Sequence, residues 1–379
     1  MTIVDRYLLR QFVVVFLICF VSLAGLYTVI DAFGRLDDFS GEGKTLSAAI
    51  ESAGRYYLLQ SVGFFNKTSG VLALIAAMFT ITWIQRHQEM TALLAAGLPR
   101  IRVLRPVLIA AVMIAVVAAG LREMVIPNLR GELARDSKNL TGEEPSELTP
   151  RYDNVSDLLL GGKHALLQSK TIVQPKFDLP PQFTSSFGGV IVGEQAIYHE
   201  ANGPRPAGYL VKGVSQPVGI DARSSLFLAN DKPLVVTTHD ASWLKPGEAY
   251  VVSGVPFDLL APDAQWRELA STSELIRVHN NPSTELGADV SVAVHTRLTQ
   301  PLLDATLLLI GLPLVVSRGA RSPYLSIGLS ILVVAGFFLV TVGGQSLGIG
   351  GWISPALAAW LPLFVFAPIA AAQSASLNQ

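Results

Sequence analysis

The sequence predicts an α-helical membrane protein with six transmembrane helices and one inserted all-β domain. Six runs hold few or no charged residues, and each approaches the roughly 20 residues that cross a ~30 Å hydrocarbon core. Half of the 379 residues are hydrophobic and only 15% are charged, which is not typical of a cytosolic enzyme. One long polar stretch separates the third run from the fourth. The runs are 12–30, 68–84, 106–121, 300–316, 324–343 and 353–372.

These runs divide the chain into three segments. Residues 1–121 hold the first three helices, 122–297 form the inserted domain and 298–379 hold the last three helices. The first run lacks a small-residue cleavage site and continues into Asp31, so we interpret it as a retained helix and not as a signal peptide.

Basic residues beside the runs predict the orientation, because short cytoplasmic segments retain Lys and Arg. With the N-terminus inside, the cytoplasmic segments carry eight basic residues against two acidic ones. The basic residues are Arg6, Arg10, Arg86, Arg100, Arg102, Arg105, Arg318 and Arg321, and the acidic ones are Asp5 and Glu89. This bias predicts that both termini are cytoplasmic and that the insertion lies outside the cytoplasm.

The insertion carries 16 basic and 21 acidic residues, a net charge of 16 − 21 = −5, which argues against a nucleic-acid surface. Its middle alternates short strand-like runs with turn residues, as in an antiparallel sandwich or jelly roll. The predicted strands are 165–173, 189–198, 208–214, 233–238 and 249–255. We expect 122–139 to extend the third helix, and 272–280 to return as a short helix or strand.

Motifs for catalysis are scarce. The run Gly41-Glu42-Gly43-Lys44-Thr45 resembles the end of a phosphate-binding loop, but its required first glycine would fall at Asp38. The six histidines lack metal-ligand spacing, so no cofactor or metal is expected. A Ser/Lys hydrolase dyad using Lys170 or Lys212 stays open.

The cytoplasmic loop 85–105 contains a predicted short helix. Met90, Leu93 and Leu94 follow i, i+3, i+4 spacing and form one apolar face, while Gly97 and Pro99 are stop signals. Arg86 and Glu89 lie at its polar edge. From the residues alone, an interfacial helix with a structural Arg/Glu pair is the simpler interpretation.

Two charges lie inside or beside the apolar runs. Lys67 and Asp304 each fall about six residues inside the outer end of their predicted helix, roughly 9 Å at 1.5 Å per residue. Charges in a membrane are costly and normally pair or face a cavity. We expect either an ion pair between them or a contact of Lys67 with a lipid phosphate, and we group Arg35 with this set.

Four segments resemble the LptF/LptG permease family of lipopolysaccharide export, also called YjgP/YjgQ. The first is Asp5-Arg6-Tyr7-Leu8, and the second is Gln85-Arg86-His87-Gln88-Glu89-Met90 followed by Ala95-Ala96-Gly97. The third joins Glu285-Leu286-Gly287, the run HTRLTQPLL at 295–303 and Gly311-Leu312-Pro313, and the fourth is ISPALAAWLP at 353–362.

The resemblance implies a permease subunit of an ABC transporter in the bacterial inner membrane. Such a subunit extracts lipopolysaccharide or a related glycolipid and passes it to periplasmic bridge proteins of jelly-roll type. It works with a paralogous permease subunit and a cytoplasmic ABC ATPase dimer, on which ATP hydrolysis takes place. The resemblance also implies that the helix at 86–97 couples to the ATPase, with Arg86, Glu89, Met90, Leu93, Leu94 and Gly97 as its contact residues.

A second class of function remains open at this point. The chain could be a membrane-anchored extracytoplasmic enzyme or sensor whose β domain acts alone. Six Gly- and Pro-rich helices are more than an anchor needs, which favours the permease.

Overall fold

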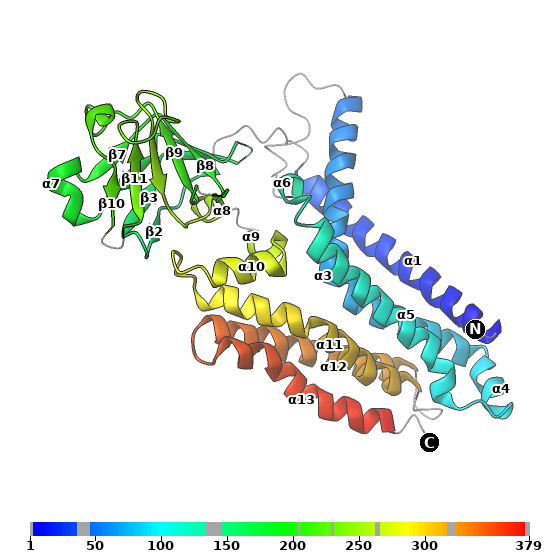
Figure 1. Cartoon of the computed structure of the whole chain (residues 1–379). Helices are drawn as coiled ribbons and strands as arrows, with labels where there is room; N and C mark the ends of the chain where they lie inside the picture. Colours follow the sequence, from blue (N-terminus) through cyan, green and yellow to red (C-terminus); the bar gives the residue numbers. More distant parts are fainter. Residues whose placement is uncertain are drawn as a thin grey trace. The chain divides into compact units, whose positions relative to one another are not determined.

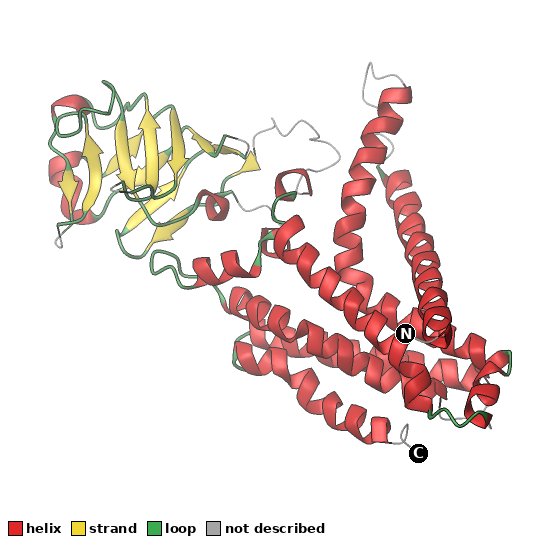
Figure 2. Ribbon diagram, turned by 45° about the vertical axis from the view of Figure 1, so that its right-hand side comes forward, coloured by secondary structure: helices red, strands yellow, loops and turns green. Residues whose placement is uncertain are grey.

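The computed structural model describes residues 3–35, 46–133, 146–167, 169–203, 205–228, 231–261, 266–316 and 323–375. The chain forms two compact units (Figures 1 and 2), and each is described by itself. The helical unit comprises residues 1–129 and 287–379, and the β unit comprises 130–286. The β unit is shorter than the segment 122–297 expected from the sequence, and the predicted domain division stays a prediction. The loop residues Gly41–Thr45, Arg318 and Arg321 lie outside the described residues.

Long helices make up the first unit, and one short helix, α4, interrupts them. They are α1 (Ile3–Gly34), α3 (Leu46–Arg86), α4 (Glu89–Ala95), α5 (Arg100–Gly120), α11 (Ala288–Val316), α12 (Pro323–Ile349) and α13 (Pro355–Ala375). A one-turn π-helix, η1 (Leu121–Val125), continues α5. Of the predicted extension 122–139, residues 122–125 continue α5 with the π-helical hydrogen-bond pattern, residues 130–133 form a short α-helix after a turn, and 134–139 lie outside the described residues.

Five helices of the described chain are long and apolar enough to cross a membrane. They are Ile3–Gly34, Ile50–Arg86, Arg100–Val125, Ile331–Ile349 and Pro355–Gln373. Helix α11 is not among them. The structure thus confirms several candidate spans, whereas the number six stays a prediction.

The core of the helical unit begins on one face of α1. Leu8, Phe12 and Phe16 recur every four residues, are at most 6% exposed, and pack with buried residues of α3 and α5. Helix α11 packs closely on α3. At Gly311 the two helices approach so closely that a Cβ would overlap the Leu74 side chain. The opposite side of α1 exposes large apolar side chains such as Leu17 and Val21.

The β unit contains two antiparallel sheets. The eight-stranded sheet has the order β1-β4-β5-β8-β9-β12-β11-β10, and the four-stranded sheet has the order β2-β3-β6-β7. The strands are β1 (Ser146–Glu147), β2 (Arg151–Asp153), β3 (Leu158–Gly161), β4 (His164–Leu166), β5 (Thr171–Val173), β6 (Lys176–Asp178), β7 (Val190–Val192), β8 (Gln195–His199), β9 (Gly208–Lys212), β10 (Leu226–Phe227), β11 (Pro233–Thr237) and β12 (Ala249–Val252).

Short helices accompany these strands at both ends of the insertion and between them. They are α6 (Arg130–Leu133), α7 (Thr184–Phe187), α8 (Phe257–Leu260), α9 (Trp266–Leu269) and α10 (Thr272–His279), with 3₁₀ turns at Pro181–Phe183 and Ile220–Ala222. The segment predicted as a short helix or strand at 272–280 is a helix. Ser271 caps it by accepting a hydrogen bond from the Glu274 amide at 3.1 Å.

The two sheets meet through fully buried aromatic residues. The ring of Phe177 on β6 lies 5.6 Å from that of Tyr209 on β9, and neither side chain is exposed. The Tyr209 hydroxyl donates to the Val255 carbonyl at 2.8 Å, so its polar end is satisfied inside the core. The predicted antiparallel β domain is confirmed, and the jelly-roll assignment stays a prediction.

Two predicted strands are each a pair of strands. The run 165–173 contains β4, a turn and β5, and Lys170 in that turn has a left-handed φ of 47°. The run 189–198 contains β7 and β8, separated at Gly193. The sequence did not reveal these turns. The first contains neither glycine nor proline, and the second contains a single glycine, Gly193.

Candidate functional site

Helix α4 forms a tight connection between α3 and α5 (Figure 1). Gln88 precedes it with a left-handed φ of 60°, and Gly97 ends it with φ 80°. Pro99 then caps α5 in an extended conformation, with φ −68° and ψ 149°. The predicted short helix and its stop signals are therefore confirmed. The short, sharp turns at both ends connect α4 closely to the two long helices.

The apolar face of α4 packs on its own chain. Met90 is only 5% exposed and belongs to the core of the helical unit, and Leu93 and Leu94 are half-buried against that core. The opposite face exposes small side chains, among them Thr91, Ala92 and Ala95. A protein that docks on α4 would meet this small-residue face, since Met90 is already covered.

Glu89 is bound to the start of α1. The Tyr7 hydroxyl donates to Glu89 Oε1 at 3.2 Å, and Arg102 Nη2 on α5 lies 3.4 Å from Asp5 Oδ2. In the described chain Glu89 does not pair with Arg86, so the expected Arg/Glu pair is wrong. The segment Asp5-Arg6-Tyr7-Leu8 thereby joins α1 to both α4 and α5.

A polar cavity of about 230 Å³ lies among α3, α5, η1, α11 and α12. Lys67 and Asp304 both line it, and the expected ion pair or lipid contact stays a prediction. Gln300 Nε2 donates to Asp304 Oδ1 at 2.9 Å. A Cβ at Gly70 would lie 2.5 Å from Asp304 Oδ1, so only glycine leaves room for this carboxylate against α3.

Arg122 is a cavity residue that the sequence analysis missed. Its side chain is 14% exposed, and Nη2 donates to the Arg297 carbonyl at 3.3 Å. Its Nε lies 3.6 Å from Glu123 Oε1 and makes no hydrogen bond in the described chain. Arg122 directly follows an apolar run, where a basic residue is usually an interfacial anchor, and no pattern linked it to Lys67 or Asp304.

Arg35 does not belong to this cavity. Its Nε lies 3.2 Å from Asp31 Oδ1, and its guanidinium lies 6.0 Å from the Tyr56 ring. Tyr56 is 11 residues (67 − 56) from Lys67 along α3, or roughly 16 Å. Arg35 forms an ion pair with Asp31, four residues earlier on α1.

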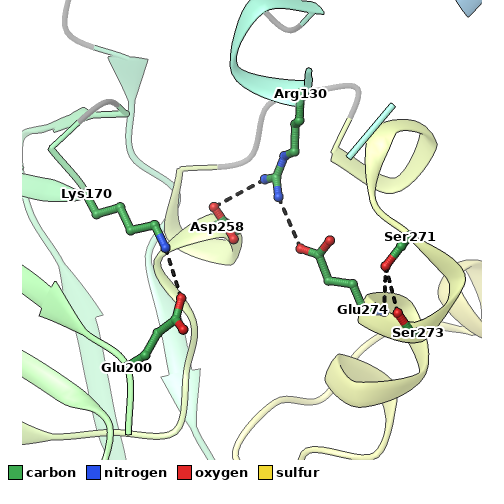
Figure 3. A network of polar contacts seen from close by, with 7 residues as sticks. All are labelled: Arg130, Lys170, Glu200, Asp258, Ser271, Ser273 and Glu274. Atoms are coloured by element: carbon green, nitrogen blue, oxygen red, sulfur yellow. Dashed lines mark hydrogen bonds and ion pairs between the residues drawn. The ribbon is translucent and has the colours of Figure 1, made fainter. Parts of the chain in front are cut away.

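The β unit has a separate polar network (Figure 3). Arg130 Nη2 lies 3.3 Å from Asp258 Oδ1, and Arg130 Nη1 lies 3.2 Å from Glu274 Oε1. Arg130 is in the first described helix of the unit and Glu274 in the last, so this arginine joins the two ends of the insertion by pairing with two different carboxylates.

One of the two lysines considered for a hydrolase dyad, Lys170, has an acidic partner. Lys170 Nζ lies 3.1 Å from Glu200 Oε1 and 5.9 Å from the centre of the Tyr198 ring (Figure 3). Burial raises the pKa of Tyr198 to about 12, so this phenol stays neutral. Within the described chain, no group of three or more His, Cys, Asp or Glu residues could hold a metal ion.

The apolar helices and the inserted β unit define a multi-pass membrane protein. The sequence matches the family of the lipopolysaccharide export system permease LptF/LptG over residues 6–155 and 248–374, well over half of the chain. The chain belongs to this family, whose members are permeases of the bacterial inner membrane. A search of curated proteins gave no match. The matched ranges omit 156–247, which includes most of the β strands.

Proposed function

We propose that this chain is a permease subunit that extracts lipopolysaccharide or a related glycolipid from the inner membrane and passes it to jelly-roll bridge proteins in the periplasm. Its partners are a paralogous permease subunit and a cytoplasmic ABC ATPase dimer. The observation that carries this proposal is α4, a short helix held tightly between two long apolar helices in a chain of this family. A movement imposed on α4 would pass directly to α3 and α5.

Helix α11 is the sixth span in this proposal. It packs against α3, α5, α12 and α13, and Leu303, Leu307 and Leu312 in its second half are at most 2% exposed. A helix enclosed by spanning helices can carry polar residues, because neighbouring helices and not lipid surround them. Six spans return the chain to the side on which it started.

The paralogous subunit would cover α1 and α12. These two have the smallest buried share among the five candidate spans, and both expose large apolar side chains, for example Ile18 and Leu339. Lipid and a second permease both suit such surfaces, and the family membership supports a partner subunit at part of this area.

The orientation gives a direct prediction. In a Cys19→Ser background, a single cysteine at Glu200 should react with an impermeant maleimide in cells whose outer membrane alone is permeabilised. A cysteine at Thr91 should react only after the inner membrane is opened. Both positions are exposed, so reactivity measures the compartment and not burial. Equal labelling of the two positions in intact spheroplasts would contradict a periplasmic insertion with a cytoplasmic α4.

Co-purification tests the function itself. The full chain, extracted in detergent, should retain an ABC ATPase, and the ATPase activity of this assembly should respond to added lipopolysaccharide. If no ATPase is retained while the β unit 130–286 alone converts a substrate, the alternative of a membrane-anchored enzyme replaces the permease.

A further inference from the structure

The polar cavity of the helical unit has two cations at similar depth. Lys67 lies 19 residues (86 − 67) from Arg86, the cytoplasmic end of α3, and this corresponds to roughly 28 Å. Arg122 lies 22 residues (122 − 100) from Arg100, the start of α5, or roughly 33 Å. Helix α3 begins at Leu46, 21 residues (67 − 46) before Lys67, so it extends far beyond the predicted apolar run, and Lys67 lies farther from this helix end than expected.

That depth coincides with one layer of the bilayer. The hydrocarbon core is ~30 Å thick, and lipid phosphates lie just outside it. With Arg86 and Arg100 at the cytoplasmic boundary, both cations reach the headgroup layer of the periplasmic leaflet. Asp304 lies deeper, because it contacts α3 at Gly70, 16 residues (86 − 70) or roughly 24 Å from Arg86.

The lining of the cavity suits a lipid headgroup with its attached chains. Lys67 is exposed at the rim, whereas Arg122 is largely buried in the wall. Phe337, Phe338 and Leu307 provide an apolar surface on the side of α12 and α11. A phosphate between the ammonium and the guanidinium would receive charge-assisted hydrogen bonds, and the acyl chains would lie against the aromatic side chains.

We propose that this cavity within a single subunit binds the phosphate group of a lipid headgroup from the periplasmic leaflet, held by Lys67 and Arg122. Asp304 is the fixed internal counter-charge of the site. Its negative charge lies in the same cavity and weakens the binding of a phosphate. The proposal rests on the proposed function for the orientation in the membrane only, and it does not depend on the ATPase.

Lipid binding to the full chain in detergent tests this inference. The probe is fluorescent phosphatidic acid, compared with diacylglycerol carrying the same acyl chains. We expect phosphatidic acid to bind at least tenfold more tightly than diacylglycerol. Lys67→Gln should weaken phosphatidic acid binding about fivefold, as expected for one cation near a headgroup. Asp304→Asn should strengthen binding, because it removes a like charge and keeps an acceptor for Gln300.

Arg55→Gln is the matched control, because Arg55 is an exposed cation on the same helix that does not line the cavity. It should leave both affinities unchanged. Arg122→Gln should weaken phosphatidic acid binding more than Lys67→Gln does. Because Arg122 is buried, the thermal unfolding of the Arg122→Gln variant is measured as well. If that variant is unstable, the Lys67→Gln result decides the outcome.

Three results would overturn the proposal. Equal affinity for phosphatidic acid and diacylglycerol would exclude a phosphate site. Displacement of phosphatidic acid by inorganic phosphate at an equal concentration would assign the site to a free anion and not to a lipid. A purely structural ion pair would leave lipid affinity unchanged in all variants, while the charge swap Lys67→Asp with Asp304→Lys restores stability that each single change lowers. Retention of the ATPase is measured separately, so failure here does not reject the permease function.

Discussion

Replacing Asp153 by alanine is expected to unfold the β unit under conditions in which the unaltered unit is folded. The Asp153 carboxylate is 1% exposed and accepts four hydrogen bonds. Its Oδ1 accepts from the Val155 and Ser156 amides at 2.9 and 3.3 Å, and its Oδ2 accepts from the Ser253 hydroxyl and the Gly254 amide at 2.6 and 3.1 Å. Alanine leaves these donors without an acceptor, which costs about 3–5 kcal/mol.

Urea unfolding of residues 130–286, followed by tryptophan fluorescence, measures this loss. Asp157→Asn is the matched control, because Asp157 is an exposed aspartate four residues away whose left-handed φ of 54° asparagine also tolerates. Its free energy of unfolding should stay within about 0.5 kcal/mol of the unaltered unit. A similarly small change in Asp153→Ala would mean that the carboxylate does not hold β2 to the segment after β12.

The importance of Asp153 could not be predicted from the sequence. Its strand, Arg151–Asp153, has three residues and is too short to show an alternating pattern. Its partners at Ser253 and Gly254 are about 100 residues away along the chain, and no local signal links the two segments. By contrast, β9, β11 and β12 were predicted with nearly correct bounds, because each is a run of four or five residues bordered by turn residues.

In the helical unit, the sequence predicted which elements exist better than which surfaces they present. The spacing of Met90, Leu93 and Leu94 correctly predicted a short amphipathic helix. An apolar face predicts that a helix packs against other apolar residues, but it does not predict which ones. Here the face of α4 packs against the core of its own chain. Lys67 and Asp304 stood out as charges beside apolar runs, whereas Arg122 and Gln300 did not, because polar residues at helix ends are common. Their convergence depends on how α3, α5 and α11 pack.

Replacing Ala95 by arginine is expected to release the ATPase while the permease remains folded. Ala95 lies on the exposed face of α4, away from the Met90 side, and arginine is a good helix former. If the ATPase packs on this face of small residues, the new side chain both fills the space and brings an unpaired charge into the interface. Such a charge costs several kcal/mol, and each 1.4 kcal/mol is about tenfold in affinity. Recovery of the ATPase in a detergent pull-down should therefore fall more than tenfold.

Three further variants separate docking from internal positioning. Thr91→Ala, on the same exposed face, adds neither bulk nor charge and should retain the ATPase. Tyr7→Phe removes only the hydroxyl that donates to Glu89, so it tests whether Glu89 acts through α1. If Tyr7→Phe and Glu89→Gln lower transport-linked ATP hydrolysis equally with the ATPase still bound, Glu89 positions α4. If Glu89→Gln alone lowers it, Glu89 contacts the ATPase directly. Full ATPase recovery and normal lipid export in Ala95→Arg would show that α4 does not couple the permease to the ATPase, because a bulky charged side chain in a tightly packed interface weakens binding.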